Sequence, residues 1–230
     1  MASILSLETS SKICSVAIHE NGVMLAGAEV HTMYSHGSKL APLIEDVKNL
    51  TGIDWNDISA IAISSGPGSY TGLRIGVATA KGLCYSLGIP LIAINTLDLL
   101  AFQMRNLVSS NTLLCPMIDA RRMEVYCKVV DKELNEIVPV QSSIITEDSF
   151  KEILSDQTVV FFGDGAMKCQ AVIRSNRALF VEGINAMASQ LGVIANEKFI
   201  EAQFEDLVSF EPFYLKEFQV KKSTKRSVES

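Results

Sequence analysis

Two short polar runs follow apolar, strand-like segments and carry the side chains most able to do chemistry. They are residues 8–11, Glu-Thr-Ser-Ser, and residues 119–122, Asp-Ala-Arg-Arg. Acids at two strand ends could face each other across a cleft and hold a magnesium nucleotide, and the contacting residues would be Glu8, Thr9, Ser10, Asp119 and Arg121. The same residue types also form ordinary caps and turns. Because neither run has the glycine that lets a backbone approach a phosphate, we favour turn formation.

Residues 64–83, SSGPGSYTGLRIGVATAKGL, connect a strand to a helix with glycine at 72, 76 and 82. Each helical glycine costs roughly 1 kcal/mol relative to alanine. A bare backbone would suit either a phosphate at the helix N-terminus or another helix packed very close. Pro67 removes an amide donor that an anion would need, so we favour a structural turn at residues 66–68. The spacing of Gly72, Gly76 and Ala80 predicts a groove for a helix of this chain or of another subunit.

Metal binding and nucleophilic catalysis have little support. The three histidines, His19, His31 and His36, match no common zinc spacing, so we expect no metal site. The chain has no Gly-x-Ser-x-Gly elbow. Its five cysteines have no Cys-x-x-Cys spacing and mostly lie in apolar runs, which fits a reducing cytoplasm.

Composition narrows the class of protein. With 230 residues, 48% of them hydrophobic, the chain can build a large core or two lobes. A net charge of −6 gives no global attraction to nucleic acid. No apolar run approaches about 18 residues, so we expect an unexported, cytoplasmic protein with no membrane contact. Residues 219–230 read as a disordered basic tail; RNA binding by Lys221, Lys222, Lys225 and Arg226 is the less favoured alternative to a solvated tail.

The predicted elements repeat in the same order. The first half is predicted to begin with three strands, at residues 4–8, 13–19 and 23–30, with a hairpin turn at Asn21-Gly22. It continues with a helix at 40–50, a strand at 60–64, a helix at 70–87 and a strand at 91–95. The second half is predicted to hold three strands at 113–119, 123–130 and 137–142, a helix at 147–154, a strand at 158–162 and a helix at 186–202. This order predicts an α/β duplication, with lobes at residues 1–98 and 99–218.

Three segments together resemble the bacterial TsaB family, also called YeaZ, which is related to the TsaD or glycoprotease (peptidase M22-like) family. They are residues 64–76, residues 4–10 and residues 118–126, and the resemblance is specific over about residues 2 to 130. Pro212-Phe213-Tyr214-Leu215 is similar to a segment near the family's C-terminus. The resemblance implies the actin, hexokinase and Hsp70-like (ASKHA) fold, a duplication of two RNase H-like lobes that each hold a mixed sheet flanked by helices.

The resemblance also implies a function without catalysis. TsaB proteins are partners of the TsaD transferase, acting with the TsaE ATPase to make threonylcarbamoyladenosine beside the tRNA anticodon. At the place of the transferase's His-x-x-x-His metal motif, this chain has residues 94–99, Ile-Asn-Thr-Leu-Asp-Leu, without a histidine. At the place of the kinases' Asp-x-Gly-Thr phosphate loop, it has Asp119-Ala120-Arg121. We therefore expect no intrinsic cofactor, with ATP or ADP only in the assembled complex. The alternative is an enzyme of the same fold, either metallopeptidase-like or an ATP-dependent small-molecule kinase.

In the family, the first two helices of the N-terminal lobe contact TsaD, or a second copy when TsaD is missing. Here they correspond to residues 39–50 and 69–87. We expect a bundle of helices from both chains, with apolar side chains such as Leu40, Leu43 and Val47 in its core. The predicted interface residues are Lys39, Leu40, Leu43, Ile44, Val47, Tyr70, Gly72, Leu73, Gly76, Val77 and Ala80.

Overall fold

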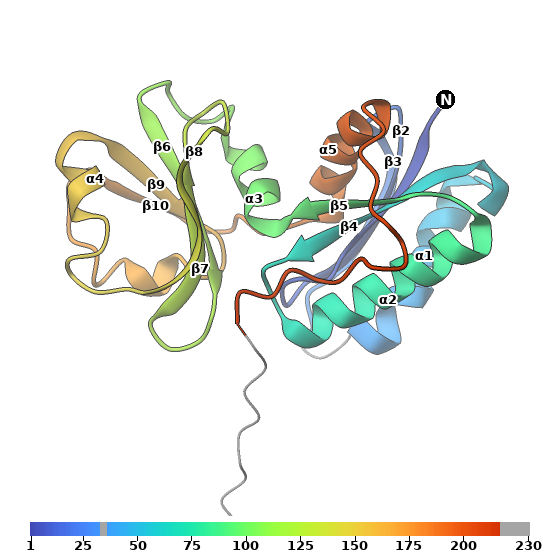
Figure 1. Cartoon of the computed structure of the whole chain (residues 1–230), viewed down its shortest axis with the longest axis horizontal. Helices are drawn as coiled ribbons and strands as arrows, with labels where there is room; N and C mark the ends of the chain where they lie inside the picture. The colour runs from blue at the N-terminus through green and yellow to red at the C-terminus, as the bar shows by residue number, and fades with distance from the viewer. Residues whose placement is uncertain (33–35, 217–230) are drawn as a thin grey trace, which may run out of the picture.

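Two lobes, each built on a five-stranded mixed sheet, lie side by side in the computed structural model (Figure 1). The structure describes residues 1–32 and 36–216, so the predicted basic tail at 219–230 lies outside the described residues. Within the described ranges, no helix is both long and apolar enough to cross a membrane.

The first sheet starts as the predicted meander. Strands β1 (Ser3–Glu8), β2 (Cys14–Glu20) and β3 (Val23–Val30) pair antiparallel, and β4 (Ile58–Gly66) and β5 (Leu91–Asn95) add parallel to β1 in the order β3-β2-β1-β4-β5. Asn21 and Gly22 both have positive φ, as the predicted hairpin turn requires. The predicted bounds of β3 and β5 are confirmed.

The second sheet repeats this arrangement. It holds β6 (Thr112–Asp119), β7 (Glu124–Val130), β8 (Glu136–Ile144), β9 (Thr158–Phe162) and β10 (Ala178–Val181) in the order β10-β9-β6-β7-β8. Again the first three strands pair antiparallel, and the fourth lies parallel to the first. The predicted duplication is therefore confirmed at the level of strand order.

Helices α1 (His36–Thr51) and α2 (Tyr70–Leu87) cover one face of the first sheet (Figure 1). Their apolar stripes pack on Leu5, Leu7, Ile61 and Ile63. The bounds of α2 are as predicted, and Gly88 ends it in the left-handed conformation. The 3-10 turn Trp55–Asp57 leads into β4. In the second lobe, α4 (Lys151–Asp156) begins four residues later than predicted, and the 3-10 turn Met167–Cys169 lies between β9 and β10.

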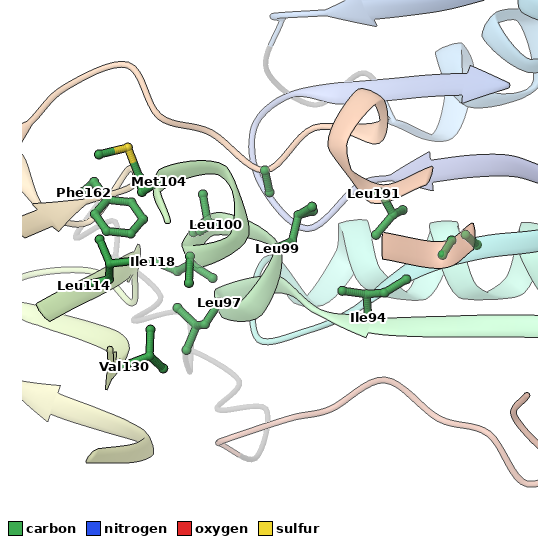
Figure 2. Close-up of a cluster of buried hydrophobic side chains, with 14 of the residues drawn as sticks. Ile94, Leu97, Leu99, Leu100, Met104, Leu114, Ile118, Val130, Phe162 and Leu191 are labelled. Carbon is green, nitrogen blue, oxygen red and sulfur yellow. The ribbon is translucent and has the colours of Figure 1, made fainter. Parts of the chain in front are cut away.

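Two helices cross between the lobes. Helix α3 (Thr96–Met104), which was not predicted, packs against β6 of the second lobe, and α5 (Ala188–Ile200) packs against β1 and β2 of the first. Figure 2 shows Leu97, Leu100 and Met104 of α3 on the side of the second sheet, and Leu99 toward Leu191 of α5. Although α5 falls within residues 99–218, it covers the remaining face of the first sheet.

A C-terminal strap, residues 201–216, returns along the first lobe after α5 (Figure 1). The backbone N–H of Glu205 donates to the carbonyl of Leu91 at 2.9 Å, and that of Phe213 donates to Ser65 at 2.7 Å. At its end, Lys216 forms an ion pair with Glu124 on β7. The strap thus runs from the edge of the first sheet to the second lobe.

Candidate partner surface and inter-lobe cleft

The carboxylate of Glu8 is sealed inside the first lobe. It ends β1 with a fully buried side chain, accepting a hydrogen bond from the backbone N–H of Ser10 at 2.6 Å and another from the Ser64 hydroxyl. Burial raises the pKa of Glu8, although both hydrogen bonds act in the opposite direction. Glu8 therefore shapes the loop that follows β1 and is not open to the cleft.

Asp119 occupies the matching position at the end of β6, but it is exposed. Its carboxylate accepts from the backbone N–H of Arg121 at 2.9 Å and pairs with Lys168. Partial burial raises the pKa of Asp119, but Lys168 and the Arg121 backbone outweigh it, and the pKa is lowered overall. The structure does not bring the carboxylates of Glu8 and Asp119 together, because each is engaged within its own lobe.

The space between the two loops is small. A cavity of about 10 Å³ lies at the lobe border, lined by Ser10, Ser11, Thr96, Ile118, Asp164 and Asn185 among others. That volume is about the size of one water molecule. Asp164 also accepts from the backbone N–H of Asp119 at 2.9 Å. Ser10 thus lies at the lobe border, and in the described conformation this cavity is too small for a nucleotide.

The glycines of α2 allow the chain's own loop to approach. A Cβ atom at Gly72 would come within 3.0 Å of the Thr9 carbonyl, and one at Gly76 would come equally close to the Thr9 hydroxyl. The predicted helix groove at Gly72, Gly76 and Ala80 is therefore wrong: the loop after β1 and the sheet occupy it. The turn at residues 66–68 has the favoured structural role, since the backbone N–H of Ser69 donates to the Ser10 carbonyl at 2.6 Å.

Most of the predicted interface side chains are buried within the chain itself. Nine of the eleven are buried, namely Leu40, Leu43, Ile44, Val47, Gly72, Leu73, Gly76, Val77 and Ala80, whereas Lys39 is exposed and Tyr70 half-buried. The expectation that Leu40, Leu43 and Val47 form an intermolecular core is thus corrected. Helical apolar periodicity marks the face toward the sheet, and the same stripe cannot serve a partner.

The solvent side of α2, opposite its buried stripe, carries small and apolar residues. We name this the outer helix face, defined by Ala78, Gly82 and Tyr85, which share one side of the helix at about 3.6 residues per turn. The side chain of Tyr85 is 85% exposed. No atom outside α2's own neighbouring backbone lies within 4 Å of a Cβ at Gly82. Gly82, the helical glycine outside the four-residue spacing of Gly72 and Gly76, is the sequence signal for this face.

Comparison with known proteins decides the family. A family model described as "TsaD: tRNA N6-adenosine threonylcarbamoyltransferase" matches residues 31–224. The tRNA threonylcarbamoyladenosine biosynthesis protein TsaB of Bacillus subtilis is 32% identical over 165 residues, covering 70% of this chain and 70% of that protein. This chain belongs to the TsaB family. The TsaB protein of Escherichia coli is 34% identical over 134 residues, which span 58% of this chain and 57% of that protein.

The solved structure of YeaZ from Pseudomonas aeruginosa matches 94% of this TsaB-family chain and 100% of its own, with a TM-score of 0.79 and 24% identity. This similarity confirms the fold, two lobes of the actin and hexokinase-like type. All five cysteines are free and buried, in keeping with their apolar context. Within the described ranges, no three His, Cys, Asp or Glu side chains cluster as metal ligands would.

Proposed function

We propose that this chain is an accessory subunit that binds the TsaD transferase and orders it for transfer of a threonylcarbamoyl group to the adenosine beside the tRNA anticodon. The supporting observation is Gly82, an exposed helical glycine at which an added Cβ would meet no atom within 4 Å outside the backbone of its own helix. Glycine at position 82 costs roughly 1 kcal/mol in helix stability. At Gly72 and Gly76 the close approach of Thr9 requires a residue without a side chain, whereas no atom of the described chain requires one at Gly82. A partner helix packed closely over Gly82 and Ala78 would account for the glycine there.

Catalysis would then belong to the partner. The cavity of about 10 Å³ between the lobes and the engagement of Glu8 inside the first lobe support a chain without turnover of its own. ATP or ADP would act in the assembled complex with the TsaE ATPase. The net charge of −6 supports contact with tRNA through the complex. In the absence of TsaD, the outer helix face would pair two copies of the chain.

Charge substitutions on the outer helix face test this proposal. Tyr85→Glu and Gly82→Glu add a carboxylate at exposed positions of α2, so neither variant should melt at a lower temperature than the unaltered chain. Leu179→Glu, at a residue 48% exposed on β10, is the matched control. Affinity for TsaD of the same organism, measured by calorimetry, should fall at least tenfold for the first two variants and remain unchanged for the control.

The rate of tRNA modification by the reconstituted complex should fall together with the affinity of each variant for TsaD. Unchanged affinity and modification in both face variants would refute the proposed interface. Turnover of ATP or a peptide by the purified chain alone, lost on Asp119→Asn, would instead establish the enzyme alternative.

A further inference from the structure

A groove lies between α2 and the C-terminal strap. Its volume is about 330 Å³, and its apolar lining comes from Val77 and Ala78 of the helix and from Phe210 and Pro212 of the strap. The inter-lobe cavity, by comparison, measures about 10 Å³. The groove is therefore large enough to receive a bulky side chain.

Several contacts fix the far wall of the groove. Lys81 of α2 donates from Nζ to the carbonyls of Val208 at 3.2 Å and Phe210 at 3.0 Å. Phe210 also packs against the core beneath α1 and α2, and the Phe213 backbone bonds to Ser65. Since these contacts hold the strap before any partner arrives, binding would require little ordering of the wall.

The charges around the groove favour an anion. Arg74, Lys81 and Glu211 line it, so two positive charges and one negative leave a net charge of +1. Lys81 is engaged with the strap carbonyls. Arg74 is exposed, with its guanidinium 4.6 Å from the ring centroid of Tyr70, whose ring lies 5.0 Å from that of Tyr214. A carboxylate at the groove mouth would meet Arg74 in a position set by this stack.

Ala78 belongs both to the outer helix face and to the groove lining. A helix packed over Ala78 and Gly82 would therefore carry its side chains past the groove mouth. We infer that the groove receives a large apolar side chain from a TsaD helix, with an acidic residue of that helix paired to Arg74. This inference rests on the proposed function and adds the strap as a second element of the partner surface, beside α2.

A thiol probe in the groove gives a direct test. Because all five natural cysteines are buried, Ala78→Cys introduces a small thiol that reacts selectively with a soluble thiol reagent. TsaD added before the reagent should slow modification of this thiol, followed by mass spectrometry of the chain. A thiol introduced by Leu179→Cys, exposed on the second lobe, should react at the same rate with and without TsaD.

Affinity measurements complete the test. Ala78→Trp fills the groove and should weaken TsaD binding at least tenfold, while Leu179→Trp should leave it unchanged. Arg74→Gln should weaken binding several-fold at low salt and less at high salt, because a screened ion pair contributes less. Both variants should keep the melting temperature of the unaltered chain, since both positions are exposed.

The outcomes separate this inference from the proposed function. If Gly82→Glu abolishes binding while Ala78→Trp and Arg74→Gln bind normally and TsaD leaves the reactivity of the Ala78→Cys thiol unchanged, the groove inference is overturned and the proposed function stands. If the unaltered chain forms no complex with TsaD, both fail.

Discussion

Gly192 of α5 lies so close to the imidazole of His19 on β2 that a Cβ atom at position 192 would come within 3.0 Å of Nδ1. The imidazole Nε2 hydrogen-bonds to the Ser189 carbonyl at 2.9 Å, and Ser15 accepts from the backbone N–H of Ala188 at 3.0 Å. These contacts dock α5 onto the first sheet.

The first prediction concerns this close approach. Gly192→Ala should lower the free energy of unfolding by about 1–3 kcal/mol, the usual cost of overpacking a core. Gly82→Ala is the matched control in an exposed helix, and it should raise that free energy by about 0.5–1 kcal/mol. Urea denaturation measures both. Equal stabilisation by the two substitutions would show that α5 does not pack on His19 as described.

The second prediction concerns pH. Burial lowers the pKa of His19, so the folded state favours the neutral ring. The unfolded chain then binds the proton more readily below an ordinary pKa of about 6.5, and stability is lost as pH falls through that value. Unfolding free energies at pH 7.5 and pH 5.5 should therefore differ more for the unaltered chain than for His19→Gln. An identical pH dependence in both proteins would contradict the buried neutral ring.

The third prediction concerns Gly76 and Thr9. Gly76→Ala should destabilise the fold by about 1–3 kcal/mol, because the new methyl group meets the Thr9 hydroxyl. That hydroxyl is buried without a hydrogen-bond partner. Thr9→Ala removes it at little cost. Part of the loss should return when both substitutions are combined, and a double-mutant cycle measures the interaction. Strictly additive effects would argue against the clash.

The fourth prediction concerns Lys128, whose side chain is only 8% exposed on β7. Its Nζ lies 2.8 Å from Asp98 on α3 and 3.3 Å from Glu136 on β8. Lys128→Met replaces the cation with an apolar side chain and should change stability by less than about 1 kcal/mol. Replacing both acids by alanine leaves the cation unpaired and should cost about 2 kcal/mol or more. Thermal unfolding compares the two; a larger loss for Lys128→Met would reverse this interpretation.

The strands and α2 could be predicted from local patterns, whereas α3 could not. Leu97, Leu99, Leu100, Ala101 and Met104 are all buried because α3 lies between the two lobes. A helix covered on several sides has no polar stripe, so helical periodicity is lost. The side chain of Asn95, which caps α3 by accepting from the backbone N–H of Leu97 at 2.9 Å, was the remaining local signal.

The candidate site, too, could be predicted only in part from local sequence patterns. Spacing alone could identify Gly72 and Gly76 as sites of close approach, but it could not say what approaches, because Thr9 is far away in the sequence. The period of Leu40, Leu43 and Val47 predicts a buried stripe, but it does not tell whether the sheet of the same chain or a partner covers that stripe. Exposure separates the two sides of a helix, and exposure depends on tertiary packing.

The exchange of α3 and α5 between the lobes has a consequence for how the protein is made. On the ribosome, the first sheet is synthesised early, yet α5, which covers Ile4, Ala60 and Ala62, begins only at Ala188. We therefore expect the nascent first lobe to keep an uncovered apolar face until most of the chain has emerged. The first lobe would then complete its folding only after the second sheet has been synthesised.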